Sequence, residues 1–273
     1  MNPPAIVHLR SRPGLATGGA MIAVLLVVVA APGMFATHPP EAIDVANALR
    51  APSGDHWFGT DHVGRDVFAR VVHGARTTLG IVSGSLLLSA IVGGLAGSLA
   101  GYARGWTDIS SGQLIEVILS FPPIFLGVMI TGILGSNVGY LVLALSVVYL
   151  PLFFRAARST TMVESAKPYV EAAQALGAGH DRVLLRHMLP NVVPAIATQY
   201  IILFPLALQV QAALGFLGLG VQPPTPDWGA SLQESKDYLL IAPWMALFPG
   251  LALIVASLAV ILVGRSLQDT GDH

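Results

Sequence analysis

Cysteine is absent from this chain of 273 residues, which excludes disulfide bonds and thiolate metal sites. Charged residues are scarce at 11%, about half of their usual share in soluble domains. The two lysines, Lys167 and Lys236, follow Ala and Ser, so a Gly-Lys-Ser/Thr phosphate loop is missing and the chain does not bind ATP in that way. A net charge of -1 gives no reason to expect nucleic acid as a partner.

Charge is missing altogether from five long stretches, which predict membrane-spanning helices. No Asp, Glu, Lys or Arg occurs in residues 13–40, 77–101, 117–154, 192–226 or 238–264. A charge at the centre of a bilayer costs about 2.5–3.5 kcal/mol, so stretches without charge are suited to lipid. The third stretch is too long for one crossing of a hydrocarbon core about 30 Å thick, and Gly135-Ser136-Asn137 supplies a turn in its middle.

We therefore expect an all-α polytopic membrane protein. Its six transmembrane helices are expected at about residues 15–36, 77–101, 115–134, 138–157, 193–217 and 244–264. Residues 1–76 would hold a cytoplasmic tail, the first helix and an extracytoplasmic loop, and residues 77–269 a core of five helices. Arg10 and Arg12 before the apolar run of residues 21–31 also suit a secretory signal, but five later spans favour a retained first helix.

The distribution of Lys and Arg favours both termini in the cytoplasm. With that orientation the inner segments hold Arg10, Arg12, Arg104, Arg155, Arg158, Lys167, Arg182, Arg186 and Arg265, and the outer segments hold Arg50, Arg65, Arg70, Arg76 and Lys236. Nine basic residues inside against five outside support this orientation, although four of the five lie in one long loop.

A polar segment, residues 158–191, separates the fourth and fifth predicted spans and would face the cytoplasm. Pro168 suits the first position of a helix and Gly177 the residue just past its end, which predicts a helix of about two turns. One face of this helix is apolar with small side chains in its middle, formed by Tyr169, Ala172, Ala173 and Leu176. Asp181 can begin a second helix that Pro190 stops. A loop that merely connects two spans is the alternative.

Glycines and prolines in the predicted spans indicate close packing and bending. Gly93, Gly97 and Gly101 recur every four residues, which predicts a stripe where a neighbouring helix packs tightly, with no moving part required. Four of the six spans are expected to bend or break at prolines that remove a helical donor: Pro122, Pro123, Pro151, Pro205 and Pro249.

Candidate polar sites are few. Glu116 borders the third span, and a partly solvated position explains it better than ion coupling, because a proton relay needs several ionisable groups at depth. The glutamines of the fifth span either line a passage or bond to neighbouring helices: Gln199, Gln209 and Gln211. His56, Asp61, His62 and Asp66 cluster in the outer loop, but without His-Glu-x-x-His spacing we expect no metal site.

Three groups of motifs occur in order over about residues 57–269. The first is Phe58-Gly-Thr-Asp61-His-Val-Gly64-Arg-Asp66 with Arg70 and Gly74-Ala-Arg76, the second is Glu171-Ala-Ala with Gly177 and His187-Met-Leu-Pro-Asn191, and the third is Phe216-Leu-Gly218-Leu-Gly220 followed by Pro223-Pro-Thr-Pro226-Asp-Trp228-Gly229. Together they resemble ABC importer permeases, and more narrowly the C-type permease subunit of dipeptide, oligopeptide and nickel importers.

The chain departs from that family at a few positions. Gln113, Glu116, Gln211 and Gly215 stand where the family often has Arg, Asp, Glu and Ser, and the ending Gly264-Arg265-Ser-Leu-Gln268-Asp269 matches only in part. These changes bear on the substrate rather than on the architecture, because the lost carboxylate at Gln211 alters the charge available to a passage.

The resemblance implies a type I ABC importer permease that is not itself an enzyme. Such a subunit pairs with a homologous permease in the bacterial cytoplasmic membrane and forms half of a translocation path for dipeptides or oligopeptides, with nickel chelates or haem-like molecules as alternative cargo. Two cytoplasmic ATPase domains bind ATP and Mg, an extracytoplasmic solute-binding protein delivers the cargo, and no cofactor is expected on this chain.

The resemblance also implies roles for particular residues. Coupling to the ATPases would fall to Tyr169, Glu171, Ala172, Ala173, Leu176, Gly177, Ala178, His187, Pro190 and Asn191. The segment with Pro223, Pro224, Pro226, Asp227 and Trp228 would dock the binding protein or cap a gate, or else stiffen the bundle. A stand-alone secondary transporter would have no need of the polar segment, and a membrane enzyme would require a catalytic cluster that the sequence does not display.

Overall fold

The computed structural model describes residues 13–271, and in that range the chain is helical, with one isolated β-bridge between Thr60 and Asp66 and no strand. The longer helices are α1 (Pro13–Ala30), α2 (Val67–Ala103), α3 (Gly105–Leu119), α4 (Pro123–Leu134), α5 (Val138–Glu164), α8 (Leu189–Phe216) and α10 (Trp244–Gly271). The short helices are α6 (Pro168–Ala175), α7 (His180–Arg182) and α9 (Trp228–Ser235). The all-α prediction is confirmed, while Arg10 and Arg12 lie outside the described residues.

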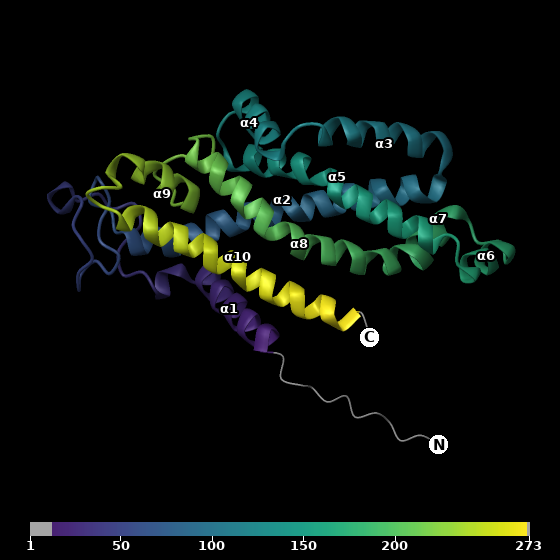
Figure 1. Cartoon of the computed structure of the whole chain (residues 1–273), viewed down its shortest axis with the longest axis horizontal. Helices are drawn as coiled ribbons and strands as arrows, with labels where there is room; N and C mark the ends of the chain where they lie inside the picture. The colour runs from purple at the N-terminus through teal and green to yellow at the C-terminus, as the bar shows by residue number, and fades with distance from the viewer. Residues whose placement is uncertain (1–12, 272–273) are drawn as a thin grey trace, which may run out of the picture.

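Long helices with roughly aligned axes, running in both chain directions, form the body of the molecule (Figure 1). The segments long and apolar enough to cross a membrane are Val67–Ala103, Val138–Glu164, His180–Phe216 and Trp244–Ser266. In the described part of the chain these are four spans, or five if the bent pair α3 and α4 counts as one, and with the shorter apolar helix α1 this is consistent with the six helices expected. The polar segment lies at one end of the bundle, and α9 with residues 31–66 lies at the other (Figure 1).

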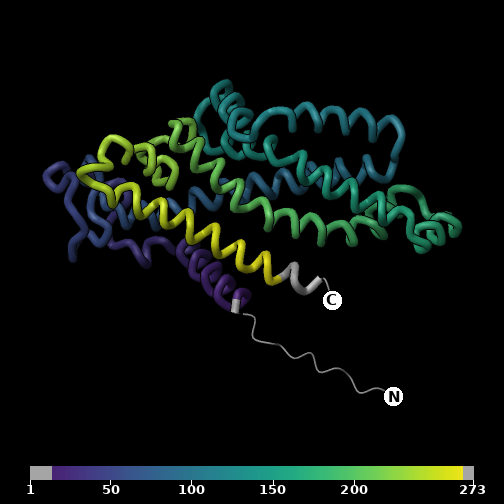
Figure 2. Tube along the Cα trace, in the orientation of Figure 1, coloured from purple at the N-terminus to yellow at the C-terminus, as the bar shows by residue number. Residues whose placement is uncertain are grey.

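The third predicted span, residues 115–134, is not one helix. α3 ends at Leu119, α4 begins at Pro123, and the two helices meet at 89°. The residue before a proline is driven out of the helical region, and Pro122 accordingly has an extended ψ of 138°. Figure 2 shows α3 running beside α5 and the chain turning sharply into α4. The predicted bend or break at Pro122 and Pro123 is therefore confirmed here.

The other prolines do not break their helices. α5 continues through Pro151, α8 through Pro205 and α10 through Pro249. A single proline removes one hydrogen bond, which neighbouring groups in a membrane helix can replace. Two prolines in succession have a stronger effect, because the second also fixes the backbone of the first.

Several helix ends differ from those expected from the charge-free stretches, among them the start of α2 and the end of α1. α2 begins at Val67 rather than at about residue 77, because the Asp66 carboxylate caps it by accepting a hydrogen bond from the Ala69 N–H at 2.7 Å. Its 37 residues extend about 55 Å, well beyond a hydrocarbon core of about 30 Å. α1 ends at Ala30 instead of at about residue 36, since Pro32 opens a separate 3-10 turn. Absence of charge marks the part of a helix suited to lipid, not its full length.

α2 and α5 pack with their backbones in close contact. The glycine stripe faces carbonyl oxygens of α5, with Gly93 against Leu150, Gly97 against Phe154 and Gly101 against Arg158. A β-carbon at Gly93 or Gly101 would lie 2.6 Å from the facing oxygen, and one at Gly97 closer still. Only glycine permits such an approach, so the predicted tight packing along the stripe is confirmed.

Side chains from four helices fill the space beside this contact. Leu86 of α2, Leu145 and Phe153 of α5, and Leu208 of α8 are fully buried in the main apolar cluster. α10 contributes Ala256 to the same cluster. The glycine stripe thus lies at the centre of the fold, and both ends of the bundle are positioned relative to it.

We expect Gly97→Ala to lower the free energy of unfolding by roughly 1–3 kcal/mol, because the added methyl group would overlap the Phe154 carbonyl. Gly80→Ala in the same helix is the matched control, since nothing lies within 4 Å of a β-carbon there. The control should be neutral or slightly stabilising because alanine favours helix. Thermal unfolding in detergent measures both variants, and equal effects would contradict the close packing of α2 on α5.

Candidate functional site

The first helix of the polar segment forms as predicted. α6 has Pro168 at its start, and Gly177 follows its end with a φ of +81°. The Gly177 N–H donates to the Gln174 carbonyl at 2.9 Å and the Ala178 N–H to the Ala173 carbonyl at 3.0 Å. These are the two bonds of a Schellman motif, which requires a left-handed residue where Gly177 stands.

One side of α6 is buried against the chain that follows it. Val170 is 1% exposed and forms a small apolar cluster with Val183, Leu184 and Met188. Ala173 packs against the same cluster. This contact holds α6 in place, so it is not a free surface loop.

The other side of α6 is exposed. Tyr169, Ala172 and Glu171 are exposed, and Leu176 is 90% exposed. The apolar face expected for this helix is therefore divided, because Ala173 points to the cluster while Ala172 and Leu176 point away from it. An anchored helix with a bare leucine beside a small side chain offers an apolar surface to a partner.

Hydrogen bonds tie the start of α6 to the helices on either side. The Tyr169 hydroxyl donates to the Glu164 carboxylate at 2.7 Å and accepts from the Asn191 amide at 3.1 Å. Asn191 also donates to the His187 carbonyl at 3.0 Å. Burial and the hydrogen bond to Glu164 raise the pKa of Tyr169, which keeps its hydroxyl protonated at neutral pH. Tyr169 and Asn191 thus connect the end of α5, α6 and the start of α8.

The second helix of the polar segment does not stop at Pro190, which corrects the prediction. α7, a π-helical turn over Val183–Met188 and α8 form one helical run of 37 residues, His180–Phe216. Pro190 lies in the first turn of α8, where the preceding π turn changes the hydrogen-bond register and a missing N–H is tolerated. The polar segment therefore continues into a membrane helix without a break.

At the opposite end, the segment before α9 is partly exposed and partly buried. Pro223 and Pro224 are exposed and Pro226 is buried, while Asp227 is 0% and Trp228 1% exposed. The Trp228 indole lies against Gly74 and donates to the Val71 carbonyl at 2.8 Å. In this structure Asp227 and Trp228 fasten α9 to α2, and the exposed surface of the segment is that of Pro223 and Pro224.

Asp227 is the centre of a buried polar group. Its carboxylate accepts hydrogen bonds from the Thr78 hydroxyl at 2.7 Å, the Gln211 amide at 2.8 Å and the Ala230 N–H at 3.0 Å. Burial raises the pKa of Asp227, and the hydrogen bonds only partly offset this.

The three glutamines of α8 have different surroundings. Gln211 is fully buried on Asp227, and its Oε1 has no partner among the described residues. Gln209 is exposed and Gln199 partly exposed, so these two are free to line a passage. Of the alternatives left open by the sequence, bonding to a neighbour therefore describes Gln211.

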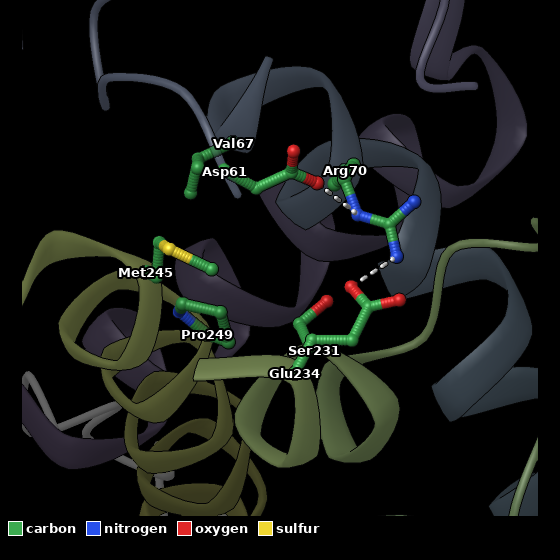
Figure 3. A pocket seen from close by; sticks show the side chains of 7 residues that line it. All are labelled: Asp61, Val67, Arg70, Ser231, Glu234, Met245 and Pro249. Carbon is green, nitrogen blue, oxygen red and sulfur yellow. Dashed lines mark hydrogen bonds and ion pairs between the residues drawn. The ribbon is translucent and has the colours of Figure 1, made fainter. Parts of the chain in front are cut away.

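Asp61, Arg65, Arg70 and Glu234 form an ion cluster that the sequence did not reveal. Arg65 contacts Asp61 at 2.5 Å and Glu234 at 2.8 Å, and Arg70 contacts Glu234 at 3.2 Å. Figure 3 shows Arg70 between the two carboxylates. The side chains are no more than 10% exposed, and two charges of each sign balance, as burial of ions requires. The spacing of Asp61 and Arg65 hinted at a pair, but Glu234 follows Arg70 by 164 residues.

A cavity of about 260 Å³ lies between α3 and α5. An ion pair between Asp108 and Arg158 lies at its wall. Glu116 and Arg155 also line it, both exposed and both without an ion-pair partner among residues 13–271. Unpaired charges of both signs thus face one cavity.

Comparison with known proteins gives matches over most of the chain. Residues 93–270 match the family model described as binding-protein-dependent transport system inner membrane component. The dipeptide transport system permease protein DppC of Alkalihalophilus pseudofirmus is 36% identical over 248 residues, which cover 91% of this chain and 81% of that protein.

Two glutathione transport system permease proteins named GsiD are similarly related. That of Escherichia coli O1:K1 is 38% identical over 266 residues, and that of Pectobacterium atrosepticum is 35% identical over 263 residues. Each alignment covers 96% of this chain and 87% of the relative.

We expect Asp227→Asn to be at least as stable as the natural protein at pH 7. Asparagine keeps the cap on the Ala230 N–H, and a rotated Gln211 amide would turn its unpartnered oxygen toward the new N–H donor. Asp227→Ala is the contrasting variant and should be destabilised by about 1 kcal/mol or more through loss of the cap. Thermal unfolding compares them, and equal losses would contradict the assignment of Asp227 as a costly buried charge.

The same group predicts a pH dependence. Because the folded pKa of Asp227 lies above its unfolded value of about 3.9, the folded protein binds more protons than the unfolded one above that pH. The Asp227 contribution to stability therefore falls as pH rises from about 4 toward neutrality. Asp227→Asn should remove this slope, which unfolding measured at several pH values will show.

Proposed function

The chain belongs to the family of binding-protein-dependent transport system inner membrane components, and on this premise we propose that it couples ATP hydrolysis on partner subunits to peptide import. It is a multi-pass membrane permease subunit of an ABC importer of the peptide and nickel family, and the ATPase activity belongs to other subunits. The observation that carries the proposal is the exposed face of α6, whose other side is anchored on a helical run that continues into a membrane helix.

The proposed assembly has four kinds of component. This chain and a homologous permease form the two halves of the path, two cytoplasmic ATPase domains bind ATP and Mg, and an extracytoplasmic binding protein delivers cargo. Both termini lie in the cytoplasm in this proposal. The separation of the polar segment from residues 31–66 at opposite ends of the bundle supports that arrangement, as does the distribution of basic residues.

Coupling rests on a stiff connection from α6 to the membrane helices. The ATPase would seat the exposed Tyr169, Ala172 and Leu176, while Glu171 offers a charged contact at the edge. Force on α6 reaches α8 through the Val170 cluster and the Tyr169–Asn191 bond, and reaches α5 through Glu164. Because His180–Phe216 is one helical run, displacement of its first turn would tilt α8 rather than bend a loop.

Peptides are the proposed cargo. The relatives named for dipeptide and glutathione transport favour peptides over nickel chelates or haem-like molecules. A free peptide carries an ammonium group and a carboxylate at neutral pH. The unpaired Glu116 and Arg155 of the cavity between α3 and α5 match those two charges, so we place part of the passage there, together with Gln199 and Gln209.

Ala172→Trp should uncouple the importer without unfolding the chain. The side chain is exposed, so the substitution blocks seating of the ATPase and leaves the Val170 cluster intact. Loss of a central interface contact costs about 2 kcal/mol or more, so ATPase stimulation by loaded binding protein in proteoliposomes should fall at least roughly tenfold. Ala172→Ser keeps a small side chain and should retain coupling. Normal stimulation of the Ala172→Trp importer would refute the assignment of α6.

The charges of the cavity predict a dependence on the peptide ends. Glu116→Gln should slow uptake of a free dipeptide by roughly tenfold, the value of one charge-assisted contact, but should leave an N-acetylated dipeptide unaffected. Arg155→Ala should slow uptake of a dipeptide with a free carboxylate by a similar factor and should leave a C-amidated dipeptide unaffected. Uptake is measured in proteoliposomes with saturating loaded binding protein. Gln113→Ala, an uncharged change at the same cavity, is the control. Equal effects of a variant on free and blocked peptides would contradict the proposal that this cavity is part of the path. That result would not bear on the coupling role of α6.

A further inference from the structure

Three metal-binding side chains converge in the loop before α2. His38, His56 and Asp66 each offer a ligand atom, and these atoms lie within 4.8 Å of one another. The His56 Nδ1 lies 2.7 Å and the His38 Nδ1 3.9 Å from the same Asp66 oxygen, Oδ2. The two imidazole rings are 5.0 Å apart between centroids. The fold thus adds His38, 18 residues before His56, to a cluster in which sequence spacing alone gave no metal motif.

These distances suit a tetrahedral zinc ion. Nitrogen and oxygen ligands lie about 2.0–2.2 Å from zinc, which places two ligands of a tetrahedron about 3.3–3.6 Å apart. The distances of 2.7 and 3.9 Å lie on either side of that range, so small rotations of the histidine side chains would bring all three atoms onto one ion. Asp66 can keep its other oxygen on the Ala69 N–H while Oδ2 binds metal.

A cavity adjoins two of the three ligands, His38 and Asp66. It holds about 20 Å³ and is lined by His38, Asp66 and a second carboxylate, Asp55, with aromatic walls that include Trp57. This volume is enough for an ion or a water molecule. Asp55 or water would supply the fourth ligand of a three-residue site.

The neighbouring electrostatics favour this group over a second one. Asp61, His62 and Glu234 also lie close enough to share an ion. There, however, Arg65 and Arg70 already neutralise both carboxylates. Among the described residues Asp66 pairs only with His38 and His56, so its charge is available to a cation.

We propose that His38, His56 and Asp66 bind a divalent zinc-like ion at the start of α2. The ion would fasten residues 31–66 to the helix that packs on α5 through its glycine stripe. This site is separate from the cavity of Glu116 and Arg155 and from α6, and the inference does not depend on the cargo.

Zinc binding to the purified complex, with every affinity tag removed and with EDTA-treated buffers at pH 7.5, tests the site. Isothermal titration should show one zinc ion that is lost, or bound at least roughly tenfold more weakly, in His38→Ala and His56→Ala. Zinc should raise the unfolding temperature of the natural protein and not that of the variants. His38 is 45% exposed on its side chain, so its variant folds even if His56→Ala does not.

Two further variants decide between alternatives. Asp66→Asn keeps a capping oxygen for α2 but removes the carboxylate, and it should weaken zinc binding without unfolding the helix start. His62→Ala is the control from the competing group and should bind zinc normally. Zinc binding unchanged in His38→Ala, or lost in His62→Ala instead, would overturn the proposal.

Discussion

The contact between α2 and α5 is the constraint on which the rest of the structure depends. Three glycines let the backbone of α2 approach carbonyl oxygens of α5 more closely than any side chain would allow. Because interior packing is tight and cannot adjust gradually, α2 and α5 behave as one unit over this length. The capped start of α2 carries the ion cluster and Trp228 contact at one end, and the end of α5 carries Glu164 at the other. The rigid pair of α2 and α5 therefore connects residues 31–66 and α9 at one end of the bundle with the polar segment at the other.

The polar segment and the bundle meet through few interactions, each of a different kind. Val170 makes an apolar contact, and Tyr169 and Asn191 form a directional hydrogen bond. The unbroken helical run His180–Phe216 carries displacement into α8. Together these interactions oppose both translation and rotation of the polar segment relative to the bundle. Val170 and Ala173 pack on the buried side of α6, which leaves Ala172 and Leu176 free for a partner, while Tyr169 both anchors the helix and stays exposed.

Local signals predicted those parts of the molecule in which the deciding residues are near one another in the chain. Charge-free stretches located the spans, Pro168 and Gly177 located α6, and four-residue spacing located the glycine stripe. The errors came from interactions that spacing does not encode. Pro190 suggested a helix end, because spacing does not reveal the π turn that precedes it. Glu234 of α9, the partner of Arg70, is far from it in the sequence. For Gln211 the sequence left both a lining role and a bond to a neighbour open, because its partner, Asp227, lies outside its helix. The family often has Glu at this position, whereas the neutral amide of Gln211 places no second negative charge beside Asp227.

The right-angled turn between α3 and α4 limits what can surround it. α4 has 12 residues and a length of about 18 Å, too short to cross the hydrocarbon core alone. At the corner, Pro122 and Pro123 carry no N–H, so the last carbonyls of α3 have fewer donors within the chain. Acyl chains provide no hydrogen bonds to make up this deficit, whereas water or another polypeptide does. The turn between α3 and α4 therefore faces water or another polypeptide in the assembled complex rather than acyl chains. The lipid around the importer contacts other parts of its surface.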